Sequence, residues 1–327
     1  MDGGEEHTAA AWPDLPFEGW RDSLNTLHMW SQIVGKTKLA LCPWLNQWWQ
    51  IALVLDARGL TTGRMPYGDR SVQVDFDFVD HSLAIRDSLG GVEALPLVAR
   101  PVAEFYKEYF EALAALGVSV EIDPLPVEVP DPIPFDVDVT HEAYDPDAAS
   151  RFWRILASTE RVLQRWRSPF VGKSSPVNFF WGSFDLNATR FSGKPAPLPV
   201  GAPRFLQLAE DQENVACGFW SGNATLSGFV YGAPAFYAYV YPEPAAFKEA
   251  SVRPDAAAYH PQLGQFILPY DEARRAPDPD EAVLAFFTSA YEAAAETAGW
   301  DRASLEQPVP TFAPRRGRRR HIEATTP

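Results

Sequence analysis

Apolar side chains recur with helical spacing at two places in the first part of the chain. Leu24, Leu27 and Val34 share one helical face, and their spacing predicts a helix that ends at Gly35. A second amphipathic helix is expected over 101–117. Four strands are expected between these helices, over 38–42, 48–55, 72–78 and 82–86, the third from strict alternation of apolar and polar residues. The pattern predicts one helix–strands–helix unit.

The same order recurs after residue 145. Asp145 and Pro146 supply an N-cap and a first-turn proline for a long helix, and Asp278 and Pro279 do the same for a last helix that stops at Gly299. Strands are expected between these two helices, over 177–181, 185–190, 216–220, 235–241 and 265–269. The pattern predicts a second helix–strands–helix unit.

Proline is concentrated between the two units. Six prolines fall within 122–146, interleaved with acidic residues, and this density excludes a helix or a central strand. The predicted organisation is a first α+β half over 1–121, a Pro-rich acidic linker over 122–146, a second half over 147–313 and a basic, disordered tail over 314–327.

Short matching strings indicate that the two halves are related. Gly35-Lys36 and Gly172-Lys173 are each predicted to form a turn, and Trp44 and Trp181 each follow eight residues after the lysine. A basic turn comes next in each half, over 58–62 and over 190–193. These matches predict an α+β fold of two helix–antiparallel sheet–helix halves, an internal duplication about a pseudo-twofold axis, with a ligand cleft between the halves.

The net charge of the chain limits which macromolecules it is expected to bind. The net charge of the 327-residue chain is −15, although five arginines lie in the tail, at Arg315, Arg316, Arg318, Arg319 and Arg320. An acidic body repels nucleic acid and anionic membranes. The sequence shows no secretory signal pattern, no apolar run long enough to span a bilayer and no paired cysteine motif, so we expect a cytoplasmic protein with reduced thiols.

Aromatic residues are abundant, with 11 Trp, 11 Tyr and 21 Phe. They indicate either a thick core or an aromatic-lined pocket. Tyr237, Tyr239 and Tyr241 alternate along one expected strand and therefore share one face. Packing of that face and a role as pocket wall or proton donor are both compatible with the sequence.

Standard catalytic signatures are absent from the sequence: it contains no dinucleotide-binding glycine motif, phosphate loop, zinc-protease motif or nucleophile elbow. His81, beside Asp80, is the best general-base candidate, because a carboxylate orients an imidazole and raises its basicity. Asp75 and Asp77 share one strand face and can hold a cation, share a proton or face solvent.

Two arginines in expected turns, Arg58 and Arg190, lie near hydroxyl residues such as Thr61. Guanidinium groups in such turns bind a carboxylate or phosphate, or form ion pairs between loops. The sequence leaves both interpretations open.

Longer strings carry a resemblance. The segments 27–36, 57–62, 76–81 and 179–193 resemble a bacterial family of unknown function, DUF5996, over nearly the whole chain. The resemblance implies histidines at the positions held here by Gln47, Asn178 and Gln212, the last followed by a glutamate that corresponds to Glu213. Three histidines and a glutamate would form a catalytic-type metal site. Amides are weak ligands for transition metals, so the resemblance implies a retained polar pocket without a metal or other cofactor.

We therefore expect a metal-independent enzyme that acts on a small organic molecule, of the isomerase, cyclase or lyase type found in specialised bacterial metabolism. No nucleic-acid or membrane partner is expected, and the oligomeric state is left open. The residues expected to transfer protons are His81, Glu213, Tyr239 and Asp185. The residues expected to bind substrate are Lys36, Gln47, Arg58, Thr61, Lys173, Asn178, Trp181, Arg190 and Gln212.

Two alternatives remain. The first is a non-catalytic ligand-binding or regulatory relative of a metal-dependent enzyme, because the simultaneous loss of three histidines is typical of such a copy. The second is a hard cation bound through other ligands, for instance His28, Asp75 and Asp77.

Overall fold

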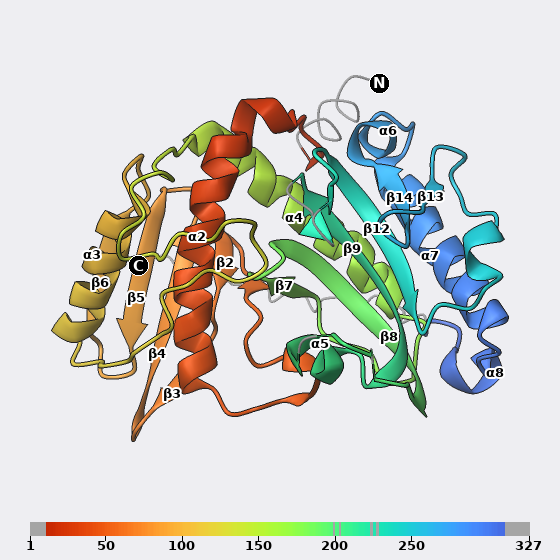
Figure 1. The fold of residues 1–327 in the computed structure, drawn as a ribbon, viewed down its shortest axis with the longest axis horizontal. Helices are drawn as coiled ribbons and strands as arrows, with labels where there is room; N and C mark the ends of the chain where they lie inside the picture. Colours follow the sequence, from red (N-terminus) through yellow and green to blue (C-terminus); the bar gives the residue numbers. More distant parts are fainter. Residues whose placement is uncertain (1–10, 199, 203, 223–224, 227–228, 311–327) are drawn as a thin grey trace, which may run out of the picture.

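In a computed structural model, the described part of the protein consists of two six-stranded antiparallel sheets, one small two-stranded sheet and covering helices, which confirms the α+β class (Figure 1). The structure describes residues 11–198, 200–202, 204–222, 225–226 and 229–310. The predicted basic tail over 314–327 lies outside these residues. None of the helices in the described ranges has the combination of length and apolar composition that crossing a bilayer requires.

The first sheet is a meander between two helices. Its strand order is β1-β2-β4-β5-β6, with β3 paired to β4. The elements are α2 (Phe17–Leu41), a short 3₁₀ turn (Asn46–Trp48), β1 (Val54–Leu55), β2 (Gly59–Thr61), β3 (Met65–Tyr67), β4 (Arg70–Asp77), β5 (Ser82–Asp87), β6 (Val92–Pro96) and α3 (Val102–Ala115).

The second sheet has the order β13-β14-β12-β9-β8-β7. Its helices begin where the sequence predicts, because Asp145 Oδ1 accepts hydrogen bonds from two backbone N–H groups of α4 and Asp278 from one of α7. The elements are α4 (Pro146–Arg167), β7 (Asn178–Phe180), β8 (Asp185–Pro195), α5 (Arg204–Ala209), β9 (Gln212–Ser221), β10 (Thr225–Leu226), β11 (Phe229–Val230), β12 (Pro234–Tyr241), a 3₁₀ turn (Phe247–Glu249), β13 (Ala258–His260), β14 (Gln265–Pro269), α6 (Tyr270–Arg274), α7 (Pro279–Thr297) and α8 (Arg302–Leu305).

The two faces of the second sheet have different neighbours. On one face α4 and α7 pack against the strands, and Phe236 of β12 lies 5.9 Å from Phe287 of α7 between ring centroids. Side chains alternate along a strand, so Tyr237 and Tyr239 point to the opposite face. Figure 1 shows α2 between the two sheets, on the side of the second sheet away from α7. The face that carries the tyrosines is therefore available for a site.

The start of the chain differs from the prediction. Helix α2 continues through Gly35 to Leu41, so the expected strand over 38–42 is helical. Tertiary contacts override the helix cost of glycine, which is about 1 kcal/mol: the Trp181 ring lies against Gly35, and Lys38 Nζ donates to the Ala52 carbonyl. The expected strand over 48–55 is reduced to β1, because Gln47 and Trp48 adopt left-handed backbone angles with φ of 51° and 63°.

Of the two Gly-Lys turns predicted from the repeat, the first is wrong, and the two pairs are not equivalent. Gly35-Lys36 lies inside a helix, whereas Gly172-Lys173 lies in irregular backbone after α4. The tryptophans also differ, because Trp44 is exposed and Trp181 is buried. The order of helix, antiparallel meander and helix does recur, but the structure does not confirm a pseudo-twofold duplication.

The Pro-rich segment 122–146 has neither helix nor strand before α4 begins at Pro146, as its prolines predict. It is nevertheless attached to the rest of the fold. Its chain passes over α2 (Figure 1), where Lys36 Nζ donates to the carbonyl oxygens of Asp123 and Leu125 at 3.0 and 2.6 Å. This attachment places the segment at the edge of the space beside the second sheet.

The contact between Gly35 and Trp181 generates a test of this packing. A Cβ atom at residue 35 would overlap the Trp181 indole, so we expect Gly35→Ala to lower the free energy of unfolding by about 1–3 kcal/mol. Gly19→Ala is the matched control, because Gly19 lies in the same helix and a Cβ there meets nothing within 4 Å. We expect the control to be neutral or to stabilise by up to about 1 kcal/mol. Equal effects in urea unfolding would contradict the proposed packing.

Candidate functional site

A cavity of about 1090 Å³ lies between α2, the Pro-rich segment and the tyrosine face of the second sheet. This volume is large enough for a small organic molecule. Aromatic side chains form much of the wall, including Trp48, Phe180, Trp181, Trp220, Tyr237 and Tyr239. Of the two readings of the three alternating tyrosines, the structure favours the pocket wall, since Tyr241 also lines the cavity.

Asp185 is the most deeply buried acid of the cavity, with 3% of its surface exposed. Its carboxylate accepts hydrogen bonds from the hydroxyls of Ser183 and Tyr237, and from Asn187 Nδ2 at 3.1 Å. Burial raises the pKa of Asp185, although these donors oppose the shift. Burial and the neighbouring carboxylate also raise the pKa of Tyr237 well above its ordinary value. The pair is therefore a tightly bonded proton donor and acceptor.

A glycine on β9 leaves room for the Tyr237 phenol. Gly218 faces Tyr237 across the two strands, and a Cβ atom at residue 218 would overlap both the Tyr237 hydroxyl and the Leu186 carbonyl oxygen. The absence of a side chain at this position allows the hydroxyl to reach Asp185. The phenol lies flat against Trp220, with ring centroids 4.4 Å apart.

Glu128 brings a second carboxyl group to the same cavity from the Pro-rich segment. The residue as a whole is exposed, but its side chain lines the cavity. There, partial removal of the carboxyl group from water raises the pKa of Glu128 to about 7, with the charge of Asp185 as a second cause. The carboxyl group lies against Gly182, where a Cβ atom would overlap Glu128 Oε1. A group with a pKa near 7 can accept or donate a proton at neutral pH.

Helix α2 holds both carboxyl-bearing segments in place. His28 Nε2 lies 2.9 Å from the Gly182 carbonyl oxygen, which accepts its hydrogen. Gln32 holds the backbone next to Glu128, since its amide donates to the Val127 carbonyl at 2.8 Å and accepts from the Val127 N–H at 2.9 Å. Burial lowers the pKa of His28 to about 4, so its imidazole is neutral at pH 7.

A second buried acid lies further along the tyrosine face. The Tyr239 hydroxyl donates to Glu210 Oε1 at 3.1 Å and Asn214 Nδ2 donates to Glu210 Oε2 at 2.5 Å. Burial raises the pKa of Glu210. Tyr239, which the sequence singled out for proton transfer, therefore lies in the cavity wall with its own carboxyl partner.

Two of the three amides at the implied histidine positions converge on a lysine. Lys173 Nζ donates to Gln47 Oε1 at 2.7 Å and to Gln212 Oε1 at 3.0 Å. Its ammonium group also lies over the Phe191 ring, 4.4 Å from the centroid. Burial lowers the pKa of Lys173. A lysine cation thus occupies the space between these two amide oxygens.

The third amide lies elsewhere. Asn178 pairs with Asn187 across β7 and β8 and is buried, and its Nδ2 has no hydrogen-bond partner among the described residues. Over the ranges that the structure describes, no three His, Cys, Asp or Glu side chains are grouped as metal ligands.

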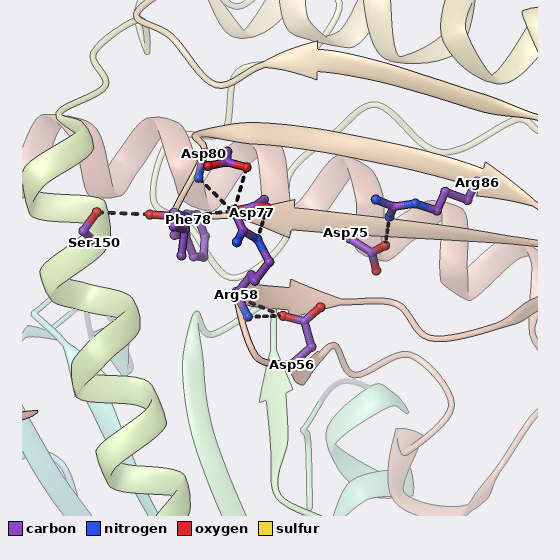
Figure 2. A network of polar contacts seen from close by, with 10 residues as sticks. Asp56, Arg58, Asp75, Asp77, Phe78, Asp80, Arg86 and Ser150 are labelled. Atoms are coloured by element: carbon purple, nitrogen blue, oxygen red, sulfur yellow. Dashed lines mark hydrogen bonds and ion pairs between the residues drawn. The ribbon is translucent and has the colours of Figure 1, made fainter. Parts of the chain in front are cut away.

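Arg58 is occupied by ion pairs on the first sheet. Figure 2 shows its side chain directed at Asp77, with Nε 2.5 Å from Oδ2, and its Nη2 also lies 2.6 Å from Asp80 Oδ2. Asp75 is paired with Arg86 further along the sheet. The salt-bridge interpretation of Arg58 is therefore favoured, and Asp75 and Asp77 are separately neutralised rather than joined around a cation.

His81, Thr61 and Glu213 are also outside the cavity wall. His81 has a left-handed backbone, and its Nδ1 lies 2.9 Å from the Tyr144 hydroxyl. Thr61 Oγ1 accepts from the Gly63 N–H, and Glu213 accepts from the Ser192 hydroxyl at 2.8 Å. Asp80 does not orient His81, because its carboxylate is paired with Arg58.

Arg190 is a core cation. Only 3% of its surface is exposed, and its guanidinium lies 4.0 Å from the Trp166 ring centroid and 4.2 Å from that of Tyr291. The Trp166 carbonyl oxygen accepts one of its hydrogens. Burial lowers the pKa of Arg190 to about 10, which leaves it charged at neutral pH. Its bonding capacity is directed into the core rather than toward a ligand.

The structure therefore brings together Gln47, Trp181, Asp185 and Tyr239 of the residues expected from sequence. Sequence reasoning missed Glu128 and Glu210 as candidate chemical groups, and it considered Tyr237 as a pocket wall or proton donor without including it among the expected site residues. Glu128 was counted as part of an acidic linker. A local signal was available for Tyr237, because it alternates with Tyr239 on the strand that was already identified.

Comparison with known proteins places these residues in a family. Residues 12–307 match the family described as "Family of unknown function (DUF5996)". No curated protein and no solved structure matches the chain significantly.

The raised pKa of Glu128 predicts a pH dependence of stability. Between pH 4.5, its ordinary value, and about 7, the unfolded chain loses this proton while the folded chain keeps it. The free energy of unfolding therefore falls as pH rises through this window, and Glu128→Gln removes that contribution. We expect the variant to gain stability relative to the wild type from pH 4.5 to 7 and then to level off.

Urea unfolding at several pH values measures this difference. Glu142→Gln is the control, because it removes an exposed carboxyl group from the same segment. If the two variants have parallel pH profiles, Glu128 does not have a raised pKa in the folded protein.

Proposed function

Because the chain belongs to the DUF5996 family, whose function is unknown, we propose an activity from its own site: a metal-independent enzyme that acts on a small organic molecule. The reaction is of the isomerase, cyclase or lyase type, and the site is the cavity between α2 and the second sheet. The observation that carries this proposal is the pair of carboxyl groups, Glu128 and Asp185, that face one aromatic cavity with the Tyr237 hydroxyl bonded to Asp185.

Glu128 acts as the general acid or base in this proposal. A pKa of about 7 leaves both protonation states populated at neutral pH, which suits proton abstraction and return within one turnover. Asp185 and Tyr237 supply the opposing proton and hydrogen bond. Asp185 and Tyr237 are buried, and the removal of water around them strengthens their electrostatic interactions.

In this proposal, residues that line the cavity bind the substrate. Trp181 provides an aromatic surface that is fixed by the hydrogen bond from its Nε1 to the Ile51 carbonyl oxygen at 3.0 Å. Gln47 provides a polar edge and is held by Lys173 and Asp211. Its left-handed backbone is strained by about 1–3 kcal/mol, and strain of this kind is concentrated at functional sites.

The polar side chains at and near the cavity support independence from a metal. Gln47 and Gln212 direct their amide oxygens at an ammonium group, and proton transfer needs only the carboxyl and hydroxyl groups already in the cavity. Lys173 and Lys36 have structural parts in this proposal, because one fixes these amides and the other fixes the Pro-rich segment that carries Glu128.

Two broader features belong to the same proposal. The first is that the two halves derive from an ancestral duplication. Each half contains a hairpin that is closed by four residues, and this supports the proposal. Residues 56–59 connect the paired Leu55 and Leu60, and residues 181–184 connect the paired Phe180 and Asp185. The enzyme works in the bacterial cytoplasm, which agrees with its free Cys42 and Cys217 thiols.

Deuterium exchange tests the reaction class without a known substrate. We propose incubating the purified protein in D₂O, with a chelator, together with a small-molecule extract of its host. A metal-independent proton-transfer enzyme will consume or deuterate at least one metabolite, detected by mass spectrometry. Tyr237→Phe and Asp185→Asn are expected to slow that change about a hundredfold or more.

His81→Gln is the matched control, because His81 lies in the turn between β4 and β5 and outside the cavity, and we expect its rate to equal that of the wild type. A metabolite that binds stoichiometrically but is never altered would instead support the non-catalytic ligand-binding alternative. Loss of activity with the chelator would contradict metal independence.

A further inference from the structure

Carboxyl groups dominate the charged groups around the cavity. Asp185 and Glu210 are buried in its wall and Glu128 faces it, and the rim adds Asp131 and Glu243. Among the described residues that line the cavity, Arg21 is the one arginine or lysine. An anionic ligand would therefore meet several acids and a single cation.

That cation is already engaged by acidic neighbours. Arg21 Nη1 lies 2.9 Å from Glu18 Oε2, and its Nε lies 3.5 Å from Asp22 Oδ1. The other cations considered as anion ligands are directed elsewhere, with Arg58 in ion pairs and Arg190 in the core. Within the described part of the cavity wall, no arginine or lysine without an acidic partner is therefore present to bind a carboxylate or phosphate.

Two buried carbonyl oxygens in the cavity wall are unpaired. Asn187 and Gln265 are 9% and 6% exposed, and among the described residues Asn187 Oδ1 and Gln265 Oε1 have no hydrogen-bond partner. The orientation of the Asn187 amide follows from its neighbour, because its Nδ2 donates to Asp185. A buried acceptor without a donor costs about 1–3 kcal/mol, which a ligand carrying N–H or O–H donors recovers.

An aromatic row lies beside these acceptors. Trp220 stacks on Tyr237 with centroids 4.4 Å apart, and Tyr237 is followed by Tyr239 at 6.2 Å with nearly parallel rings. Ring faces attract cations, most strongly where water is excluded. The Asp185 carboxylate accepts the hydroxyl hydrogen of the central ring, Tyr237, so ring faces and carboxyl groups favour the same sign of ligand charge.

We propose that the cavity binds an organic amine in its protonated form, with the ammonium group between the aromatic row and the carboxyl groups of Asp185 and Glu128. The Asn187 carbonyl oxygen accepts one of its hydrogens. This inference rests on the proposed function in naming the substrate class of the same cavity, but it requires binding alone and no catalysis.

Binding of a cation in this place depends on pH. The titratable and charged groups that line the cavity with Glu128 are Arg21 and His28 on α2, Asp131 and His141 within the Pro-rich segment, Asp185 on β8, Glu210 before β9, Tyr237, Tyr239 and Tyr241 on β12, and Glu243. His28 is neutral, and His141 Nδ1 is bonded to the buried Asp138 at 2.7 Å. The ammonium group favours ionised carboxyl groups, so affinity for an amine rises as pH increases from 5 to 8.

Three probes with the same ring and chain separate the possibilities: 3-phenylpropylamine, 3-phenylpropanol and 3-phenylpropanoate. Calorimetric titration of the full chain is expected to show the amine binding about tenfold or more tightly than the alcohol at pH 7.5. Of the three probes, 3-phenylpropanoate is expected to bind most weakly. Equal affinities, or tightest binding of the carboxylate, would overturn the proposal.

Variants locate the binding site. Glu128→Gln and Asp185→Asn are expected to reduce the preference for the amine over the alcohol, whereas Asp75→Asn, on the first sheet, leaves it unchanged. If a cavity variant does not fold, the pH dependence of amine binding to the wild type tests the proposal instead. An affinity for the amine that stays constant or falls between pH 5 and 8 would overturn it. Amine binding without metabolite turnover would refute only the proposed enzymatic function.

Discussion

Three polar side chains on one face of α2 connect the parts of the molecule that form the cavity. His28, Gln32 and Lys36 are spaced four residues apart, which places them in one row along the helix. They bind the Gly182 turn, the backbone next to Glu128 and the start of the Pro-rich segment. Burying such groups is costly unless they are hydrogen-bonded, and backbone groups of distant segments provide the partners. The same bonds hold a segment without regular structure in a defined position.

Burial gives this cavity its chemical character. The acids in its wall have raised pKa values because the protein removes them from water, and hydroxyl and amide donors from neighbouring strands limit the shift. Small residues permit the required contacts: Gly218 admits the Tyr237 phenol, and Gly182 admits the Glu128 carboxyl group. The acids, the aromatic row and the unpaired Asn187 oxygen together favour a ligand that is positively charged and donates hydrogen bonds.

Local patterns predicted many elements correctly, and their failures share one cause. The capped helices at Asp145 and Asp278 and the alternating strands β4 and β12 agree with the structure, because capping and alternation depend on near neighbours. The expected strand over 38–42 failed because contacts from Trp181 and Ala52 stabilise helix through Gly35. The Gly-Lys repeat failed for a related reason, since identical short strings adopt different structures in different surroundings.

The sequence by itself determined the α+β class, the family resemblance, the irregular Pro-rich segment and the shared face of the three tyrosines. Each of these follows from composition, periodicity or motif, which are local properties of the chain. Only the tertiary structure decided which polar groups meet. It directed Arg58 and Arg190 away from the cavity and brought Glu128 and Asp185, which are 57 positions apart in the sequence, to the wall of one cavity. Burial and partner geometry arise when distant segments pack, so no pattern along the chain specifies them.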